Sequence, residues 1–254
     1  METMCLIAFR WQPDAAQPLV LAANRDEFHA RPTRALAWWR WPNGPLAGRD
    51  EQAGGTWLAA GRDGRVAAIT NYRDPKAASG ARSRGELPLA WLKHEETAAG
   101  FGARLHARRA DYGPFNLIFG DCSTLWIVGT HAAPAPIEPG THALSNHLLD
   151  TPWPKSIRAV RGMEQWHEQH NYDFDRLLDL LDDREPADEH ELPKTGVERE
   201  LEAMLSAPFI VSQRYGTRCS IALVLGERIT MAERTFDPNG KAIGERLFGW
   251  TRAG

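Results

Sequence analysis

Short apolar runs broken by turn residues open the chain. Residues 4–9 and 19–23 are two such runs, and residues 12–18 between them contain two prolines and one aspartate. Apolar runs of this length flanked by polar residues predict buried strands, and the intervening turn predicts a hairpin. The hairpin would bring the polar residues after the second run, 24–27, close to Cys5.

The same patterns continue along the chain. Further strands are predicted at residues 56–60, 66–71, 115–119, 125–128, 142–145, 217–225 and 229–236. Helices are predicted at residues 88–109, 155–170, 174–181 and 197–205. The stretch that holds Pro32, Pro42 and Pro45 is predicted to be irregular,. Strands linked by short turns favour mainly antiparallel sheets, with the helices packed outside them.

Composition limits the class of protein. The chain has 254 residues with no internal repeat or linker, so one domain over residues 1–254 is predicted,. A net charge of −3 gives no basic field for nucleic acid,. No apolar run approaches the roughly 20 residues of a membrane span. The three cysteines form no CxxC pair, which argues against a disulfide framework and predicts a reducing, cytoplasmic location,.

Cys5 is the candidate nucleophile. Taken alone, a cysteine in an apolar strand is more often a buried core residue than a nucleophile. Its interpretation changes because polar residues stand at the ends of other predicted strands: Asp26, Asn71, Asn146 and Arg218. Turn chemistry also explains each of them separately. Rigid strands can aim short side chains at one point, so their coincidence with Cys5 predicts one site.

Other residues offer weaker signals. Tryptophans near residues 24–27 suit either an apolar pocket or ordinary core packing; they are Trp38, Trp39, Trp41 and Trp57. Several arginines suit either anion binding or a solvated surface; they are Arg25, Arg49, Arg73 and Arg84. His167 and His170 lie three apart without a third ligand, which favours a solvated helix face over a metal site,. No nucleotide-binding or serine-hydrolase motif is present, and no cofactor is predicted,.

Longer motifs carry a family resemblance. They include Met4-Cys5-Leu6-Ile7, Ala23-Asn24-Arg25-Asp26-Glu27-Phe28, Ala47-Gly48-Arg49-Asp50, Gly54-Gly55-Thr56-Trp57-Leu58, Thr70-Asn71-Tyr72-Arg73, Leu144-Ser145-Asn146, Asp150-Thr151-Pro152-Trp153-Pro154-Lys155 and Tyr215-Gly216-Thr217-Arg218. In this order they resemble the NRDE family, also called the transport-and-Golgi-organisation family, over nearly the whole chain. That family is similar to the cysteine N-terminal-nucleophile hydrolases of the choloylglycine hydrolase and penicillin acylase group.

The resemblance implies a fold and a site. The fold is α+β, a four-layer αββα sandwich with mainly antiparallel sheets. Cys5 would be the nucleophile and its own α-amine the base, with the amine held by Asp26. Asn71 and Asn146 would donate to the oxyanion, and Arg218 would lower the pKa of the thiol. The candidate ligand-binding residues are Asn24, Arg25, Glu27, Trp57, Tyr72 and Arg73.

Two classes of function stay open. In the first, Cys5 hydrolyses an amide or thioester bond of a small acylated substrate. In the second, the same pocket holds haem, acyl-CoA or another amphipathic lipid-like ligand for trafficking, without a covalent step; a vestigial site on a scaffold is a third reading. Residues 1–4 precede Cys5, so the amine base requires a start at Met4 and removal of that methionine.

Overall fold

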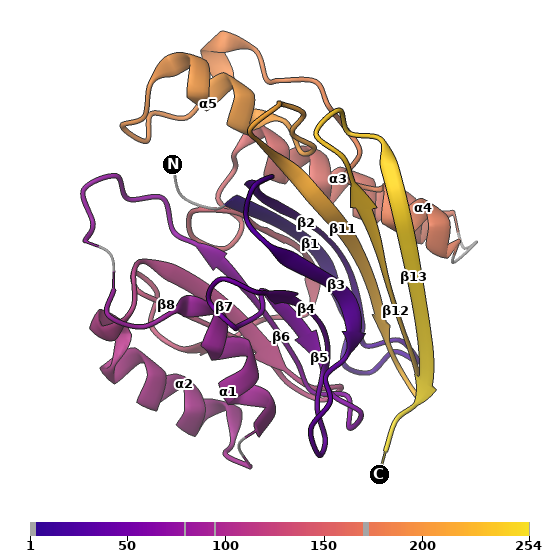
Figure 1. Cartoon of the computed structure of the whole chain (residues 1–254). Coiled ribbons are helices and arrows are strands. Elements are labelled where there is room, and N and C mark those ends of the chain that lie inside the picture. The colour runs from indigo at the N-terminus through magenta and orange to yellow at the C-terminus, as the bar shows by residue number, and fades with distance from the viewer. Residues whose placement is uncertain (1–3, 79, 94, 170–172, 254) are drawn as a thin grey trace.

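The computed structural model describes residues 4–78, 80–93, 95–169 and 173–253. Two antiparallel sheets lie face to face, with helices on their outer sides (Figure 1). The first sheet runs in the order β10 (Gly140–Leu144), β1 (Met4–Trp11), β2 (Leu19–Phe28), β11 (Tyr215–Leu225), β12 (Arg228–Phe236) and β13 (Ala242–Thr251). The second runs in the order β3 (Thr33–Trp38), β4 (Leu46–Asp50), β5 (Leu58–Ala60), β6 (Val66–Asn71), β7 (Phe115–Gly120), β8 (Leu125–Gly129) and β9 (Ala135–Pro136).

Helices form the two outer layers. The α-helices are α1 (Leu87–Lys93), α2 (Ala98–Ala107), α3 (Pro154–Glu168), α4 (Phe174–Asp179) and α5 (Arg199–Ser206). Short 3₁₀ turns are η1 (Arg84–Glu86), η2 (Arg109–Asp111) and η3 (Glu189–Glu191). In Figure 1, α1 and α2 cover the second sheet while α3 and α4 cover the first. The predicted α+β four-layer sandwich with mainly antiparallel sheets is confirmed.

Strict alternation along β1 and β2 divides the first sheet into two faces. Ile7 and Leu21 point between the sheets and join the large central core. Leu6 and Ala22 point the other way and pack against α3 and α4. Successive side chains of a strand face opposite sides of the sheet, so the other residues of β1 and β2 also alternate between the central core and the helix side.

The structure differs from the sequence prediction in several elements. The single helix expected over residues 88–109 is two helices, because Thr97 accepts a hydrogen bond from the amide of Gly100 and begins α2 as its N-cap,. The stretch expected to be irregular forms β3 and β4, with its prolines outside the paired segments. β13 was not predicted, because its sequence mixes glycine and charge with apolar residues on an exposed edge strand.

The described helices do not include one that combines the length and apolar character needed to cross a membrane.

Candidate functional site

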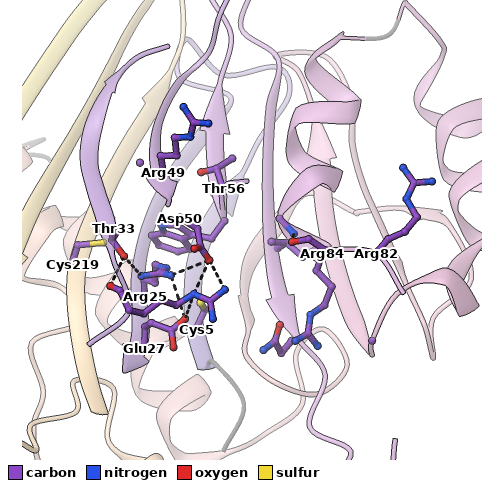
Figure 2. A pocket seen from close by; sticks show the side chains of 18 of the residues that line it. Cys5, Arg25, Glu27, Thr33, Arg49, Asp50, Thr56, Arg82, Arg84 and Cys219 are labelled. Atoms are coloured by element: carbon purple, nitrogen blue, oxygen red, sulfur yellow. Dashed lines mark hydrogen bonds and ion pairs between the residues drawn. The ribbon is translucent and has the colours of Figure 1, made fainter. Parts of the chain in front are cut away.

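A cavity of about 240 Å³ opens between the two sheets. Its walls come from β1, β2, β11 and β12 of the first sheet, from β4 and β6 of the second, and from the loop before α1. The lining side chains that carry chemistry are Cys5, Arg25, Glu27, Arg31, Arg49, Asp50, Asn71, Arg82, Arg84, Cys219 and Glu233. Figure 2 shows Cys5, Arg25, Glu27 and Asp50 gathered together, with Arg82 and Arg84 across from them.

The Cys5 thiol lies on the inner face of β1, at the cavity wall. The residue is 2% exposed and its strand pairs with β2 so that Cys5 is opposite Arg25. Burial, and then the negative charge of Asp26, raise the pKa of the thiol to about 12, although the Arg25 cation and the main-chain amide of Asp26 act against them,. The thiol is therefore protonated at neutral pH and needs a base before it can attack.

The polar segment after residue 23 is divided between the two faces of β2. Arg25 and Glu27 point into the cavity. Asn24 points to the helix side, where its Nδ2 donates to the carbonyl oxygens of Leu181 and Pro208, both at 3.0 Å. Asp26 also faces away from the cavity, and Thr217 Oγ1 donates to its Oδ1 at 2.7 Å. The sequence prediction that Asp26 ends a strand is wrong, because β2 continues through Phe28.

A network of opposite charges builds one wall of the cavity. Arg31 Nε donates to Asp50 Oδ2 at 2.8 Å, and Arg31 Nη2 lies 2.7 Å from the same oxygen as an ion pair. Arg25 lies 3.3 Å from Glu27 and 3.9 Å from Asp50. The hydrogen bonds from Arg31 and from the amide of Ala53 hold the pKa of Asp50 below its usual value despite burial,. The network fixes the Arg25 guanidinium beside Cys5 and presents it to the cavity.

Asn71 and Asn146 join the ends of two strands. Asn71 ends β6 and lines the cavity with Cys5. Asn146 is fully buried, and its Nδ2 donates to the main-chain oxygen of Asn71 at 3.0 Å. Ser145 Oγ donates to the main-chain oxygen of Cys5 at 3.2 Å, so the same segment also holds β1. Asn71 is placed to face a ligand, whereas Asn146 holds Asn71 in position.

The other predicted site residues lie in different places. Trp57 lines the cavity. Arg218 sits at a bulge in β11 and donates from Nη1 to the carbonyl oxygens of Phe28, at 2.9 Å, and Arg31, at 3.0 Å. Tyr72 and Arg73 do not line it; the Tyr72 ring lies against His131, and Arg73 forms a 2.6 Å ion pair with Glu202.

Sequence reasoning missed several cavity residues. Cys219 pairs with Arg25 from β11, so Arg25 lies between Cys219 and Cys5. The backbones of Cys5 and Cys219 are two strand spacings apart, each about 4.8 Å. This separation exceeds the roughly 7 Å limit on the Cα–Cα distance across a disulfide. Glu233 accepts from the amide of Leu36 at 2.8 Å, and burial raises its pKa. Pairing of β11 with β2 and β12 creates these contacts, and no local motif marks them.

Among the described residues, no cluster of three or more histidine, cysteine or acidic side chains is suited to hold a metal ion. Of the two histidines noted above, His167 belongs to α3 and His170 lies outside the described residues.

Comparisons with solved structures find distant similarity. The chain is similar to a Caenorhabditis elegans N-acylethanolamine-hydrolyzing acid amidase ortholog, with a TM-score of 0.49, 13% identity, and coverage of 70% of this chain and 85% of that one. It is also similar to penicillin V acylase from Agrobacterium tumefaciens, with a TM-score of 0.42, 12% identity, and coverage of 96% and 86%.

Sequence comparisons are much closer. Transport and Golgi organization protein 2 homologs from Homo sapiens and Bos taurus are 34% and 33% identical to the chain over 256 aligned residues, covering 91% of it and 93% of each homolog. The family described as Transport and Golgi organisation 2 matches residues 4–238. The resemblance inferred from the motifs is confirmed, and the chain belongs to the Transport and Golgi organisation 2 family.

Proposed function

We propose that this protein is a hydrolase in which Cys5 attacks the carbonyl of an amide or thioester in a small acylated substrate. The observation that carries the proposal is the position of the thiol: it opens on a cavity that also presents Asn71 and the Arg25 guanidinium. A nucleophile, a potential oxyanion donor and an anion-binding group thus face one cavity. In the same proposal, the chain acts as one domain, and its three free cysteines suit a reducing, cytoplasmic compartment,.

The chemistry proceeds through an acyl-enzyme. In a chain that begins at Cys5, the α-amine takes the thiol proton as sulfur bonds to the carbonyl carbon, and the carbonyl electrons move to oxygen. Asn71 donates to that oxyanion, a contribution of roughly 3 kcal/mol to the barrier for one donor. The carbon–nitrogen or carbon–sulfur bond then breaks, the leaving group takes the proton, and water hydrolyses the thioester formed on Cys5.

The shape and charge of the cavity narrow the substrate class. A volume of about 240 Å³ is smaller than the roughly 300–1,000 Å³ of sites that enclose a drug-sized ligand,. It suits a short acyl group, or one end of a longer molecule. Five arginines face three carboxylate side chains in the lining, so the cavity favours substrates that carry a carboxylate or a phosphate,.

The arginines also support the second candidate, a binding and trafficking role for haem, acyl-CoA or a similar amphipathic ligand. Arg49 lies in the lining and its guanidinium stacks on Trp39 at 5.0 Å, so its charge is available at an exposed edge,. In this role the anionic group of the ligand would bind the arginines, and the thiol would have no chemical part.

A pair of substitutions separates the two roles. Chains started at Met4 are produced so that methionine removal exposes Cys5, and intact mass confirms the new terminus. A hydrolase loses all turnover of an amide and thioester panel in Cys5→Ala, while Cys122→Ala, at a residue that does not line the cavity, stays active. A binding protein keeps its ligand in Cys5→Ala and releases it in Arg25→Ala. Because Arg25 is buried, Arg49→Ala provides the same test at an exposed residue.

Absence of turnover across the panel, combined with ligand release by both arginine variants, would remove the hydrolase proposal. Turnover that survives Cys5→Ala would remove it as well.

A further inference from the structure

Two buried polar atoms close to Cys5 have no hydrogen-bond partner in the described part of the chain. They are Asp26 Oδ2 and Lys155 Nζ. The residues are 1% and 2% exposed, so water does not reach them from the surface. Burial of an ammonium or carboxylate without a hydrogen-bond partner costs several kcal/mol in order of magnitude. Their persistence therefore points to a role other than stability.

Lys155 occupies an unfavourable position for a cation. It lies in the first turn of α3, directly after Pro154. The free amide groups of a helix N-terminus carry partial positive charge and disfavour a neighbouring ammonium. The helix packs on β1, the strand that carries Cys5, and on β10. Both burial and the helix dipole therefore disfavour the Lys155 ammonium at this position.

Asp26 lies on the same side of the first sheet. Alternation along β2 points it toward the helix layer, with Asn24 and away from Arg25. One of its oxygens is used by Thr217, and the other stays available. Met4 pairs with Asp26 across β1 and β2, and Cys5 is the next residue. The α-amine of a chain that begins at Cys5 would thus arise next to Asp26.

The two groups influence each other's charge. Burial, then the Arg73 cation, lower the pKa of Lys155 to about 8, while the charges of Asp26, Cys5 and Glu202 act in the opposite direction. Burial raises the pKa of Asp26 to about 6, and Lys155 is the strongest influence against that rise. Arg25 lowers the pKa of Asp26 as well, by its charge, and Thr217 by its hydrogen bond. Near neutral pH, ammonium and carboxylate therefore coexist.

We propose that Lys155 is a positioning residue for the proposed hydrolase reaction: its ammonium keeps Asp26 ionised, so that Oδ2 can accept a hydrogen bond from the α-amine of Cys5. The positive charge of Lys155 also offsets the negative charge of Asp26. An α-amine beside Asp26, with the Lys155 charge opposing that of Asp26, therefore stays close to its ordinary pKa of about 8 and can accept the thiol proton at neutral pH. This inference rests on the proposed function and adds the residue that sets its pH dependence.

The first test measures the titration of Lys155 and its dependence on Asp26, without any substrate. The chain contains five lysines: Lys76, Lys93, Lys155, Lys194 and Lys241. Labelling lysine with ¹³C and following the Cε signals with pH gives one titration curve for each, and Lys155→Arg assigns the curve of Lys155. We expect Lys155 to titrate near pH 8 and Asp26→Asn to lower that value further. Titration near ~10.4, as for a lysine in water, would overturn the proposal.

The second test follows Cys5 in chains that begin with it. Turnover, or alkylation of Cys5 by iodoacetamide where no substrate has been found, is measured from pH 5 to 9. Lys155→Met should shift the acidic limb upward by about one pH unit and lower the rate at pH 7 about tenfold. Lys155→Arg should restore it, since arginine keeps the charge. The exposed Lys76→Met is the matched control and should follow the wild type.

The outcomes separate this inference from the hydrolase proposal. A shifted limb rescued by arginine supports the positioning role. Superimposed limbs for wild type and Lys155→Met overturn it, even when turnover is robust. If Lys155 titrates near pH 8, responds to Asp26→Asn and controls alkylation, but no substrate is hydrolysed, the pair stands and the hydrolase proposal fails alone.

Discussion

Asn146 donates a hydrogen bond from Nδ2 to the main-chain oxygen of Asn71 at 3.0 Å. The bond connects the segment after β10, in the first sheet, with the end of β6, in the second. A short buried amide thus sets the distance between the sheets where the cavity opens, and places Asn71 opposite the strand of Cys5.

Asn146→Ala should therefore lower stability. Removing the amide leaves a carbonyl oxygen without this donor, which costs about 1–3 kcal/mol. Urea unfolding followed by tryptophan fluorescence measures the loss. Asn239→Ala, at an exposed turn, is the control and should change the free energy of unfolding by less than about 0.5 kcal/mol,. Equal effects of the two substitutions would show that Asn146 does not hold the sheets together.

Close contact between two loops shapes the far wall of the cavity. A Cβ added at Gly55 would lie 2.4 Å from the main-chain carbon and oxygen of Gly85, and the amide of Thr56 donates to that oxygen at 2.9 Å. Gly55→Ala must push these backbones apart and should cost about 1–3 kcal/mol. It should also weaken binding of any anionic ligand held by Arg84 in the same loop.

A matched glycine on a helix provides the control. Gly100 is exposed in α2, where alanine is preferred by about 1 kcal/mol,. Gly100→Ala should leave stability unchanged or raise it, as measured by thermal unfolding. If Gly55→Ala is equally well tolerated, the loops are free to separate and do not form a fixed wall.

Cysteine labelling reports on the environment of the thiol. Cys5 and Cys219 are 2% and 4% exposed, whereas Cys122 is half-buried. With a pKa of about 12, only about one Cys5 thiol in ten thousand, or fewer, is ionised near pH 7.5,. Iodoacetamide should therefore modify Cys122 first when residues 1–4 are retained, and peptide mass spectrometry identifies the site.

The same reaction tests the base. In chains that begin at Cys5, the α-amine can take the thiol proton, and labelling of Cys5 should accelerate at least about tenfold. Cys122→Ser removes the fast background and leaves Cys5 visible. Rapid labelling of Cys5 in the longer chain would contradict the protonated, buried thiol described above.

The sequence predicted the layers well because they depend on local patterns. Apolar runs and turn residues located β1, β6 and β7 to within a few residues, and the first half of β2. β3 and β4 were missed because prolines and tryptophans around them conceal a strand pattern whose pairing is fixed by the neighbouring sheet. The missed elements are therefore those whose structure depends on tertiary contacts.

The site residues also divide into those that the sequence predicted and those whose positions depend on tertiary contacts. Cys5 and Asn71 were predicted from their strands, and Arg25 from the family resemblance, and all three line the cavity. The bulge that turns Arg218 toward Phe28 and Arg31 depends on how β11 pairs with β2. The environment of Lys155 arises only when α3 packs on β1, so its sequence motif gave no indication of a buried ammonium without a hydrogen-bond partner.

Lys155 makes the stability of the protein depend on pH in a defined window. Its pKa is about 8 in the folded chain against 10.5 as the ordinary value, so the unfolded chain binds more protons between these pH values. Stability should therefore rise with pH across this window, whereas below pH 8 the full cost of the buried ammonium is present. The shift corresponds to about 3 kcal/mol in order of magnitude.

Lys155→Met removes this cost and its pH dependence. At pH 7 the gain from removing the buried ammonium is opposed by the buried Asp26 carboxylate, which loses the Lys155 charge,. The stability of the variant relative to the wild type should therefore fall by about 1–3 kcal/mol between pH 8 and 10.5, where only the wild type loses the cost of the ammonium, measured by urea unfolding at intervals of half a pH unit,. Groups common to both chains, such as Tyr112, whose pKa is raised to about 12, cancel in this difference. Parallel stability curves for the two proteins across this range would mean that Lys155 does not titrate within it.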